Sequence, residues 1–203
     1  NLKRLPEEIG ELSALEHFSV GNNELRVLPA SLGKLSMLSY LSAANNQLRD
    51  LPLELADASS LRKLFLFDNP LVRIPEAVRR MTQLEWLQLS GCDLREVPMW
   101  IGELKNLTRL TLNRNKLRHL SGTTGDLESL QTLELNDNEL RSLPESVGGL
   151  TNLNALWLRG NPIQTLPVSL VKLFKPPEQQ FVEWDYPIIR MDPGCPEAFP
   201  EKY

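Results

Sequence analysis

The sequence predicts an α/β solenoid in which one short coil is stacked seven times into a single elongated domain. A strict internal repeat is the first observation that predicts this fold. Each coil opens the same pattern, L-x-x-L-x-L-x-x-N-x-L-x-x-L-P-x-x-I-G-x-L, and a fixed period of this length is typical of solenoids. The opening leucines lie 23 residues apart without a slip, at Leu15, Leu38, Leu61, Leu84, Leu107, Leu130 and Leu153.

The first half of the pattern predicts a short strand. In L-x-x-L-x-L the last two apolar residues alternate with polar ones, so a strand sends the apolar pair to one face and the residues between them to the other. One coil cannot bury this pair alone, but stacked coils form one continuous core, with parallel strands about 4.8 Å apart. The inward pairs are Phe18 and Val20, Leu41 and Ala43, Leu64 and Leu66, Leu87 and Leu89, Leu110 and Leu112, Leu133 and Leu135, and Leu156 and Leu158.

An asparagine follows the strand in almost every coil, at Asn23, Asn46, Asn69, Asn115, Asn138 and Asn161. We expect these amides to stack as an inward ladder and to bind backbone groups that the chain frees when it turns off the strand. Coil four carries Cys92 at this place. We predict that Cys92 is a buried packing residue and not a reactive thiol.

The second half of the pattern predicts an irregular or helical convex side, opposite a curved sheet. Its apolar residues close the coil over the strand, and in coil one they are Leu25, Leu28, Leu32 and Leu35. Coil five departs from the pattern, because Ser121 replaces the proline and Thr124 replaces a buried aliphatic residue. We expect this segment to pack less tightly than its neighbours, either as tolerated drift or as a hinge or secondary contact.

Leucine–proline or similar pairs recur in the convex half, at Leu28-Pro29, Leu51-Pro52, Ile74-Pro75, Val97-Pro98, Leu143-Pro144 and Leu166-Pro167. With the repeat pattern above, these pairs resemble the leucine-rich-repeat family over residues 1 to about 174. The variant is similar to the intracellular Ras-group repeats of scribble-like scaffolds, Ras-suppressor proteins and leucine-rich-repeat kinases, and also to repeats in some bacterial effectors. The resemblance implies a scaffold or recognition role.

The repeat also predicts the domain boundaries. Residues 1–175 form the leucine-rich-repeat domain, in which residues 1–12 match the back half of a coil and seven full repeats follow from Leu15. Residues 176–203 contain six prolines, too many for further coils, together with large apolar residues that argue against a disordered linker. We predict an irregular Pro-rich C-terminal cap that opens with a helical turn at 178–184. The start of a further segment is the alternative.

Composition narrows the possible partners and the setting. With 26 acidic and 22 basic side chains the net charge is −4, which does not suggest a nucleic-acid partner. No apolar run approaches the roughly 20 residues of a membrane span. Cys92 and Cys195 are the only cysteines. Two cysteines cannot build the pair of disulfide-rich caps typical of secreted repeat proteins, so we expect a reducing, cytoplasmic setting.

No combination of residues points to catalysis. The two histidines, His17 and His119, fall four coils apart, which is roughly 19 Å at the usual strand spacing. Neither cysteine has a histidine at metal-ligand spacing, and no phosphate-binding Gly-x-x-x-x-Gly-Lys loop occurs. We therefore expect no enzyme active site, cofactor, metal or small-molecule substrate within these residues.

The third, fifth and seventh positions of L-x-x-L-x-L-x-x-N should point outward from the sheet, and we call this surface the concave face. Four of the thirteen aromatic residues fall there in coils two to four. Exposed apolar patches usually mark interaction sites, and aromatic residues are frequent interface hot spots. The predicted partner-binding residues are Tyr40, Lys63, Phe65, Phe67, Trp86, Arg109 and Trp157. Alternatively, the rings only cover one another or lie beneath a flanking cap.

Two other surface features leave alternatives open. An arginine row follows the N-x-L motif at Arg26, Arg49, Arg95, Arg118 and Arg141. The row binds an acidic partner or, as we favour, pairs with nearby carboxylates at Glu24, Asp93 and Glu139. On the convex side, Met99 and Trp100 form a second contact or pack on the neighbouring coil.

Two functions fit the sequence. The first is a non-catalytic adaptor or scaffold that binds a protein partner through the concave face. The second is a substrate-recognition domain of a larger enzyme, such as a kinase or an effector E3 ubiquitin ligase. Both use the same surface, and the sequence on either side of this segment distinguishes them.

Overall fold

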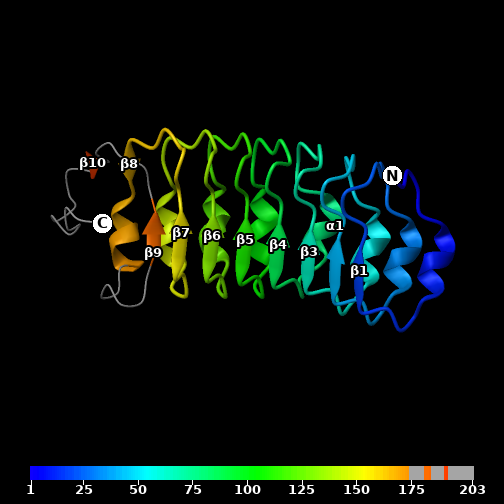
Figure 1. Ribbon diagram of the computed structural model, residues 1–203. Helices are drawn as coiled ribbons and strands as arrows, with labels where there is room; N and C mark the ends of the chain where they lie inside the picture. The colour runs from blue at the N-terminus through cyan, green and yellow to red at the C-terminus, as the bar shows by residue number, and fades with distance from the viewer. Residues whose placement is uncertain (174–180, 184–189, 192–203) are drawn as a thin grey trace.

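The computed structural model describes residues 1–173, 181–183 and 190–191, and it confirms the predicted solenoid (Figure 1). Neighbouring strands pair in parallel at a constant offset of 23 residues, so that Leu41 lies opposite Leu64 and Leu64 opposite Leu87. One three-residue strand comes from each coil: β1 (His17–Ser19), β2 (Tyr40–Ser42), β3 (Lys63–Phe65), β4 (Trp86–Gln88), β5 (Arg109–Thr111), β6 (Thr132–Glu134) and β7 (Ala155–Trp157).

A short helix closes each coil on the convex side, behind the sheet in Figure 1. In most coils a proline with extended backbone leads into it, as at Pro29, where φ is −68° and ψ is 143°. The helices are η1 (Glu7–Glu11), η2 (Ala30–Lys34), η3 (Leu53–Asp57), α1 (Glu76–Arg79), η4 (Met99–Glu103), η5 (Gly122–Asp126), η6 (Glu145–Gly149) and η7 (Val168–Leu173), of which only α1 is an α-helix and the others are 3-10 helices.

Close stacking of these helices explains the glycine of the I-G pair. A Cβ on Gly33 would lie 2.0 Å from the carbonyl oxygen of Glu54, and one on Gly125 would lie 1.9 Å from that of Ser146. Both contacts are with backbone, which cannot turn aside as a side chain can. Coil three has Arg79 at this position, and there the turn is the α-helix α1.

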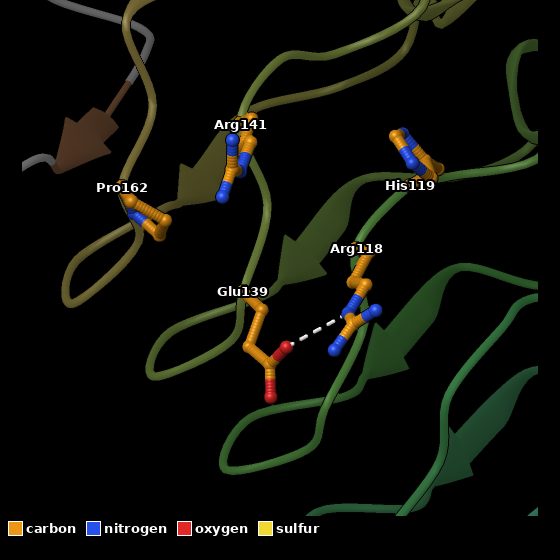
Figure 2. A pocket seen from close by; sticks show the side chains of 5 residues that line it. All are labelled: Arg118, His119, Glu139, Arg141 and Pro162. Carbon is orange, nitrogen blue, oxygen red and sulfur yellow. Dashed lines mark hydrogen bonds and ion pairs between the residues drawn. The ribbon is translucent and has the colours of Figure 1, made fainter.

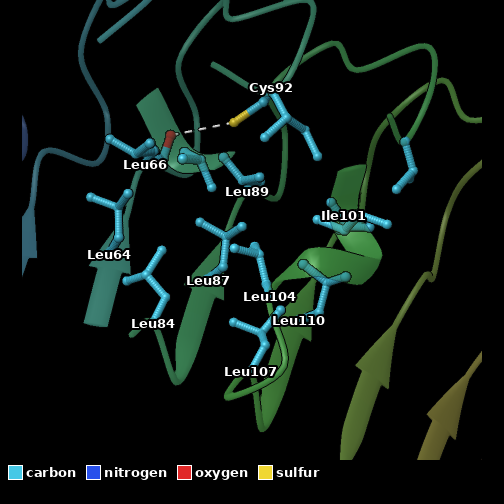
Figure 3. Packing of buried hydrophobic residues seen from close by; sticks show 14 of the residues in the cluster. Leu64, Leu66, Leu84, Leu87, Leu89, Cys92, Ile101, Leu104, Leu107 and Leu110 are labelled. Carbon is cyan, nitrogen blue, oxygen red and sulfur yellow. Dashed lines mark hydrogen bonds between the residues drawn. The ribbon is translucent and has the colours of Figure 1, made fainter. Parts of the chain in front are cut away.

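The core runs the length of the solenoid between the sheet and the convex helices, and Figure 3 shows the part of it around Leu64, Leu87 and Leu110. Inward leucines of successive strands, such as Leu64, Leu87 and Leu110, are all 0% exposed. Leucines from the convex half, such as Leu104, close over them. The core is therefore continuous from coil to coil, as the period predicts.

The asparagine ladder is confirmed. The Asn46 amide nitrogen donates to the carbonyl oxygens of Val20 (2.9 Å) and Ala43 (3.1 Å), and its Oδ1 accepts the N–H of Leu25 at 2.9 Å. Each amide thus ties the end of its own strand to the coil before it. The ladder reaches the N-terminal half-coil, because Asn23 Oδ1 accepts the N–H of Leu2 at 2.8 Å.

Cys92 replaces the asparagine in coil four, and its prediction as a buried packing residue is also confirmed. The thiol is 0% exposed and lies 3.3 Å from the carbonyl oxygen of Leu66, to which it donates. Burial raises the pKa of Cys92 to about 12, so the thiol stays protonated at neutral pH. Only the thiolate is a good nucleophile, and Cys92 therefore serves packing.

The prediction of looser packing in coil five is wrong for the described turn. The segment forms η5 like its neighbours, and Thr124 is 1% exposed. Ser121 accepts a hydrogen bond from the N–H of Thr123 and so caps the helix where a proline stands in other coils. The cost of the substitution lies elsewhere: within the described residues, Thr124 Oγ1 is buried without a hydrogen-bond partner.

We therefore expect Thr124→Val to raise the free energy of unfolding by about 1 kcal/mol, because an unpaired buried hydroxyl is replaced by a methyl group of the same shape. Coil six already carries Val147 at this position. Thr123→Val is the matched control. It removes a hydroxyl that donates to the carbonyl oxygen of Met99 at 2.6 Å, and should lower stability. Urea unfolding distinguishes the two, and a destabilising Thr124→Val would contradict the unpaired hydroxyl.

The C-terminal end differs from the prediction. Residues Phe181–Glu183 form strand β9, which pairs in parallel with β7 and extends the sheet, so the predicted helical turn at 178–184 is wrong for these residues. The last strand of a stack has an open edge, and an extended proline-free segment can pair with it. A second small sheet joins β8 (Thr165–Leu166) to β10 (Arg190–Met191). The rest of the predicted cap lies outside the described residues.

Candidate functional site

Four rings from four consecutive coils form a continuous row on the concave face. His17 contacts Tyr40, Tyr40 contacts Phe65, and Phe65 contacts Trp86, with ring-centroid distances of 6.0, 5.1 and 4.7 Å. All three contacts are edge-to-face, the geometry in which the positive edge of one ring meets the negative face of the next. We call these four residues the aromatic row.

Arg109 of the next coil ends the row. Its guanidinium carbon lies 4.6 Å from the centroid of the Trp86 ring, within the range of a cation–π contact. The same guanidinium donates to one carboxylate oxygen of Glu134, from Nε at 3.0 Å and also from Nη2. Asn113 donates to the other oxygen at 2.8 Å. Stacking on one side and hydrogen bonds on the other therefore hold Arg109 in one place.

Tyr40, Phe65 and Trp86 are half-buried because neighbouring rings cover part of each, whereas His17 at the end of the row is exposed. Trp86 Nε1 is buried and has no hydrogen-bond partner among the residues described. Small side chains between the long ones are buried as well: Ser42 is 6% exposed and Thr111 only 1%. Thr111 lies between Gln88 and Glu134 in the sheet register, and we infer that these longer side chains cover it. Outward direction alone therefore does not make a position accessible.

The structure brings together most of the residues predicted from the sequence. Tyr40, Phe65, Trp86 and Arg109 are in contact, and exposed Lys63 lies between Tyr40 and Trp86 in the strand register. The other two predicted residues lie apart from this group.

Phe67 and Trp157 are the two that lie apart. Phe67 is half-buried beyond the end of β3, and within the described chain it makes no ring contact with the aromatic row. Trp157 lies on β7 opposite Glu134 in the register. Glu134 is the residue that binds Arg109, and it therefore lies between Trp157 and the coil of Arg109. These two residues extend the candidate surface without joining the row.

Three residues of this site are not among the predicted partner-binding residues: His17, Asn113 and Glu134. His17 occupies the same register position as Tyr40, so reading neighbouring coils for ring-to-ring contact would have found it. Glu134 and Asn113 gain their role only from the length of Arg109, which reaches across to the next coil. Spacing alone carries no signal for such a side-chain contact.

Ion pairs between arginines and carboxylates flank the aromatic row. Arg62 lies 3.9 Å from Glu85, and Arg114 lies 3.0 Å from Asp68, two coils away. Lys63 is exposed and has no ion pair within the part of the chain that is described. The surface around the rings thus carries both signs of charge, with Lys63 as an available cation.

On the convex side, Met99 and Trp100 behave differently from each other. Met99 is 77% exposed, whereas Trp100 is half-buried and packs against the core. The packing interpretation therefore holds for Trp100. Within the described ranges, no group of three or more His, Cys, Asp or Glu side chains is placed to hold a metal ion, and no helix is long and apolar enough to cross a membrane.

Comparison with known proteins assigns the class of repeat. The sequence profile of the leucine rich repeat family matches residues 105–163. A comparison with curated proteins gave no match. The coils within residues 105–163 match leucine-rich repeats, and the fold of the chain is that of a leucine-rich-repeat solenoid, which commonly serves protein–protein recognition.

Solved structures of the same fold come from bacteria and plants. A leucine-rich-repeat protein of Leptospira interrogans is 31% identical with a TM-score of 0.66, over 91% of this chain and 52% of that one. The plant peptide hormone receptor RGFR1, in complex with RGF2, is 31% identical with a TM-score of 0.75, over 90% and 30%. An internalin from Listeria monocytogenes is 25% identical with a TM-score of 0.73, over 91% and 52%. The chain thus spans about half or less of these neighbours.

Proposed function

We propose that these repeats form a non-catalytic protein-recognition module, an adaptor or scaffold, whose partner lies on the concave face across the aromatic row. The observation that carries this proposal is the unbroken line of four rings that ends beneath Arg109. Aromatic residues and arginine are the side chains most often found as interface hot spots. In this line they occupy five consecutive coils.

The row is suited to binding because it is already ordered. Edge-to-face contacts fix the rings, and Glu134 fixes Arg109, so a partner would immobilise few additional side chains. The half-exposed rings offer apolar contact, while Lys63 offers a cation to an acidic group of the partner. Mixed apolar and charged character of this kind is typical of protein interfaces.

The comparisons support recognition as the role. RGFR1 is a peptide hormone receptor and was solved with RGF2 bound, so a neighbour of this fold recognises a peptide ligand. We also propose the cytoplasmic setting and the Ras-group, scaffold-like subtype that the leucine–proline pairs favour. Both rest on the sequence features given above.

A second function is favoured by one specific observation. The solved structures that resemble this chain are much longer than it, since the chain spans 52% of one and 30% of another. The same concave face would then select substrates for an enzyme, such as a kinase or an E3 ubiquitin ligase, encoded elsewhere in a longer protein. The sequence on either side of this segment decides between the two.

Affinity capture tests the concave face directly. We expect Phe65→Ala with Trp86→Ala to reduce the recovery of specific partners at least about tenfold, equivalent to 1.4 kcal/mol of binding. The control is Leu53→Ala with Met99→Ala, which removes two exposed apolar side chains, 46% and 77% exposed, from convex helices. Quantitative mass spectrometry of proteins captured from cell extract measures both.

Two checks keep this capture experiment decisive. Thermal unfolding must show that the concave double variant still folds cooperatively, since each ring pair also contributes about 0.5–1.5 kcal/mol of stability. Lys63→Glu, an exposed charge reversal beside the row, should weaken capture without touching the fold. If the convex variant lost capture and the concave variants kept it, the partner would bind the convex side, and the proposal would be wrong.

A further inference from the structure

We propose that the solenoid has a second recognition surface, separate from the concave face: a basic groove along the edge of coils four to seven that binds an acidic peptide segment. The groove lies in the loops that follow strands β4, β5, β6 and β7, and Figure 2 shows its second part, with Arg118, His119, Glu139, Arg141 and Pro162. It contains the last three of the five arginines in the arginine row, Arg95, Arg118 and Arg141.

Two adjoining pockets make up this groove. The first, of about 280 Å³, is lined by Arg95, Lys116, Arg118 and Glu139. The second, of about 580 Å³, is lined by Arg118, His119, Glu139, Arg141 and Pro162. Arg118 and Glu139 line both, so the two pockets form one continuous hollow along four neighbouring coils.

The predicted pairing of the arginine row with nearby carboxylates is only partly confirmed. Arg118 binds Glu139 at 3.0 Å, but Glu24 lies near Lys3, at 3.9 Å, and Asp93 binds Lys116 at 2.6 Å. The carboxylates of Glu24 and Asp93 therefore pair with lysines and not with arginines of the row.

Arg95 and Arg141 remain as available cations. Both side chains are exposed, and neither guanidinium has an ion pair or hydrogen bond within the described residues. They lie two coils apart, roughly 10 Å at the usual coil spacing, on either side of the neutralised Arg118–Glu139 pair. An extended segment with several carboxylates can reach both at once.

Charge complementarity identifies an acidic peptide as the occupant. The whole chain has a net charge of −4, so a local excess of cations in one hollow stands against the general acidity of the surface. His119 and Pro162 add flat and apolar surface to the second pocket, which suits a polypeptide. An extended peptide advances about 3.4 Å per residue, so alternate acidic side chains lie about 7 Å apart, and two long arginine side chains that start roughly 10 Å apart can reach two of them.

Arg26 and Arg49, at the N-terminal end of the arginine row, provide a matched control for Arg95 and Arg141. Val72 interrupts the row in coil three and separates Arg26 and Arg49 from the groove. Arg26 donates to Gln47 at 3.3 Å, and neither it nor Arg49 lines the two pockets. Reversing either pair changes the net charge of the protein by the same amount.

The probe is a fluorescein-labelled ten-residue peptide in which glutamate alternates with serine, and fluorescence anisotropy of this chain with the peptide is the measurement. We expect saturable binding that weakens when salt rises from about 50 to about 500 mM, because salt screens exposed charges. Arg95→Glu with Arg141→Glu should lower the affinity at least about tenfold, whereas Arg26→Glu with Arg49→Glu should change it less than about twofold. The concave variant Phe65→Ala with Trp86→Ala should bind the peptide as the unchanged chain does.

Several results would overturn the groove. Absence of binding to the glutamate peptide, or equal binding of a glutamine–serine peptide, would show that the hollow does not recognise carboxylates. Equal losses in the two arginine pairs would show diffuse attraction instead of a site. Complete competition by a few millimolar inorganic phosphate would indicate a small-anion site and not a peptide groove. Circular dichroism checks that each variant is folded, and the arginine variants are changed only at exposed residues.

Discussion

Leu110→Ala is expected to lower the free energy of unfolding by about 2–5 kcal/mol, the cost of lost burial plus the cavity left behind. Leu110 is 0% exposed at the centre of β5, and its neighbours in the register are Leu87 and Leu133. Both neighbours are themselves fully buried and held by their own strands, so the site cannot collapse to fill the space. The effect should therefore lie toward the upper part of the range.

Thr132→Ala is the control for Leu110→Ala. Thr132 belongs to the next strand, points toward the concave face and is half-exposed, so its truncation should cost less than about 0.5 kcal/mol. Thr111, which also points toward the concave face, is unsuitable because it is buried. Urea unfolding of the two variants measures the difference. Equal losses would mean that the inward and outward sides of the strands are wrongly assigned.

Gly125→Ala is the second change expected to have a large effect, and we expect a loss of about 1–3 kcal/mol, the usual cost of overpacking, or more. The new Cβ would lie 1.9 Å from the carbonyl oxygen of Ser146 in the next coil. Relief requires the two backbones to move apart, and this would loosen η5 from η6, which stack directly on each other.

Gly122→Ala supplies a matched control in the same convex turn. A Cβ at Gly122 meets nothing within 4 Å, so this variant should be neutral, or more stable by about 0.4–1 kcal/mol because the unfolded chain loses freedom. Differential scanning calorimetry compares the two alanines. A harmless Gly125→Ala would show that the convex helices do not depend on close backbone contact.

The exact period explains why so much of the fold can be predicted from the sequence. A repeat of 23 residues fixes the register of every strand at once, and with it the inward position of Leu64, Leu87 and Leu110. The asparagine ladder follows for the same reason, since each amide meets the same backbone groups in each coil. Cys92 could be predicted as buried because it occupies a ladder position.

Accessibility on the concave face depends on something that the period does not contain, namely the lengths of neighbouring side chains. Thr111 is buried because Gln88 and Glu134 are long, and His17 joins the row because Tyr40 reaches it. Coil five shows the same limit on the convex side, where the hydroxyl of Ser121 caps a helix that elsewhere follows a proline. Such contacts require the positions of the atoms.

The end of the sheet could not be predicted from composition either. Proline content argued against further coils after Lys175 and gave no sign of a further strand, but Phe181–Glu183 contains no proline and extends the sheet along β7. Pairing at an open strand edge needs only a short extended segment. The average composition of the 28 residues after Lys175 does not reveal a strand of three residues.

Site-specific photo-cross-linking tests most directly whether the concave face holds the partner. A benzophenone side chain would replace Lys63, which is exposed beside the aromatic row, or Met99, which is 77% exposed on the convex side. Both sites accept a bulky side chain without disturbing the core. On irradiation with a captured partner, we expect a covalent adduct from position 63 and none from position 99. An adduct from position 99 alone would contradict recognition through the concave face.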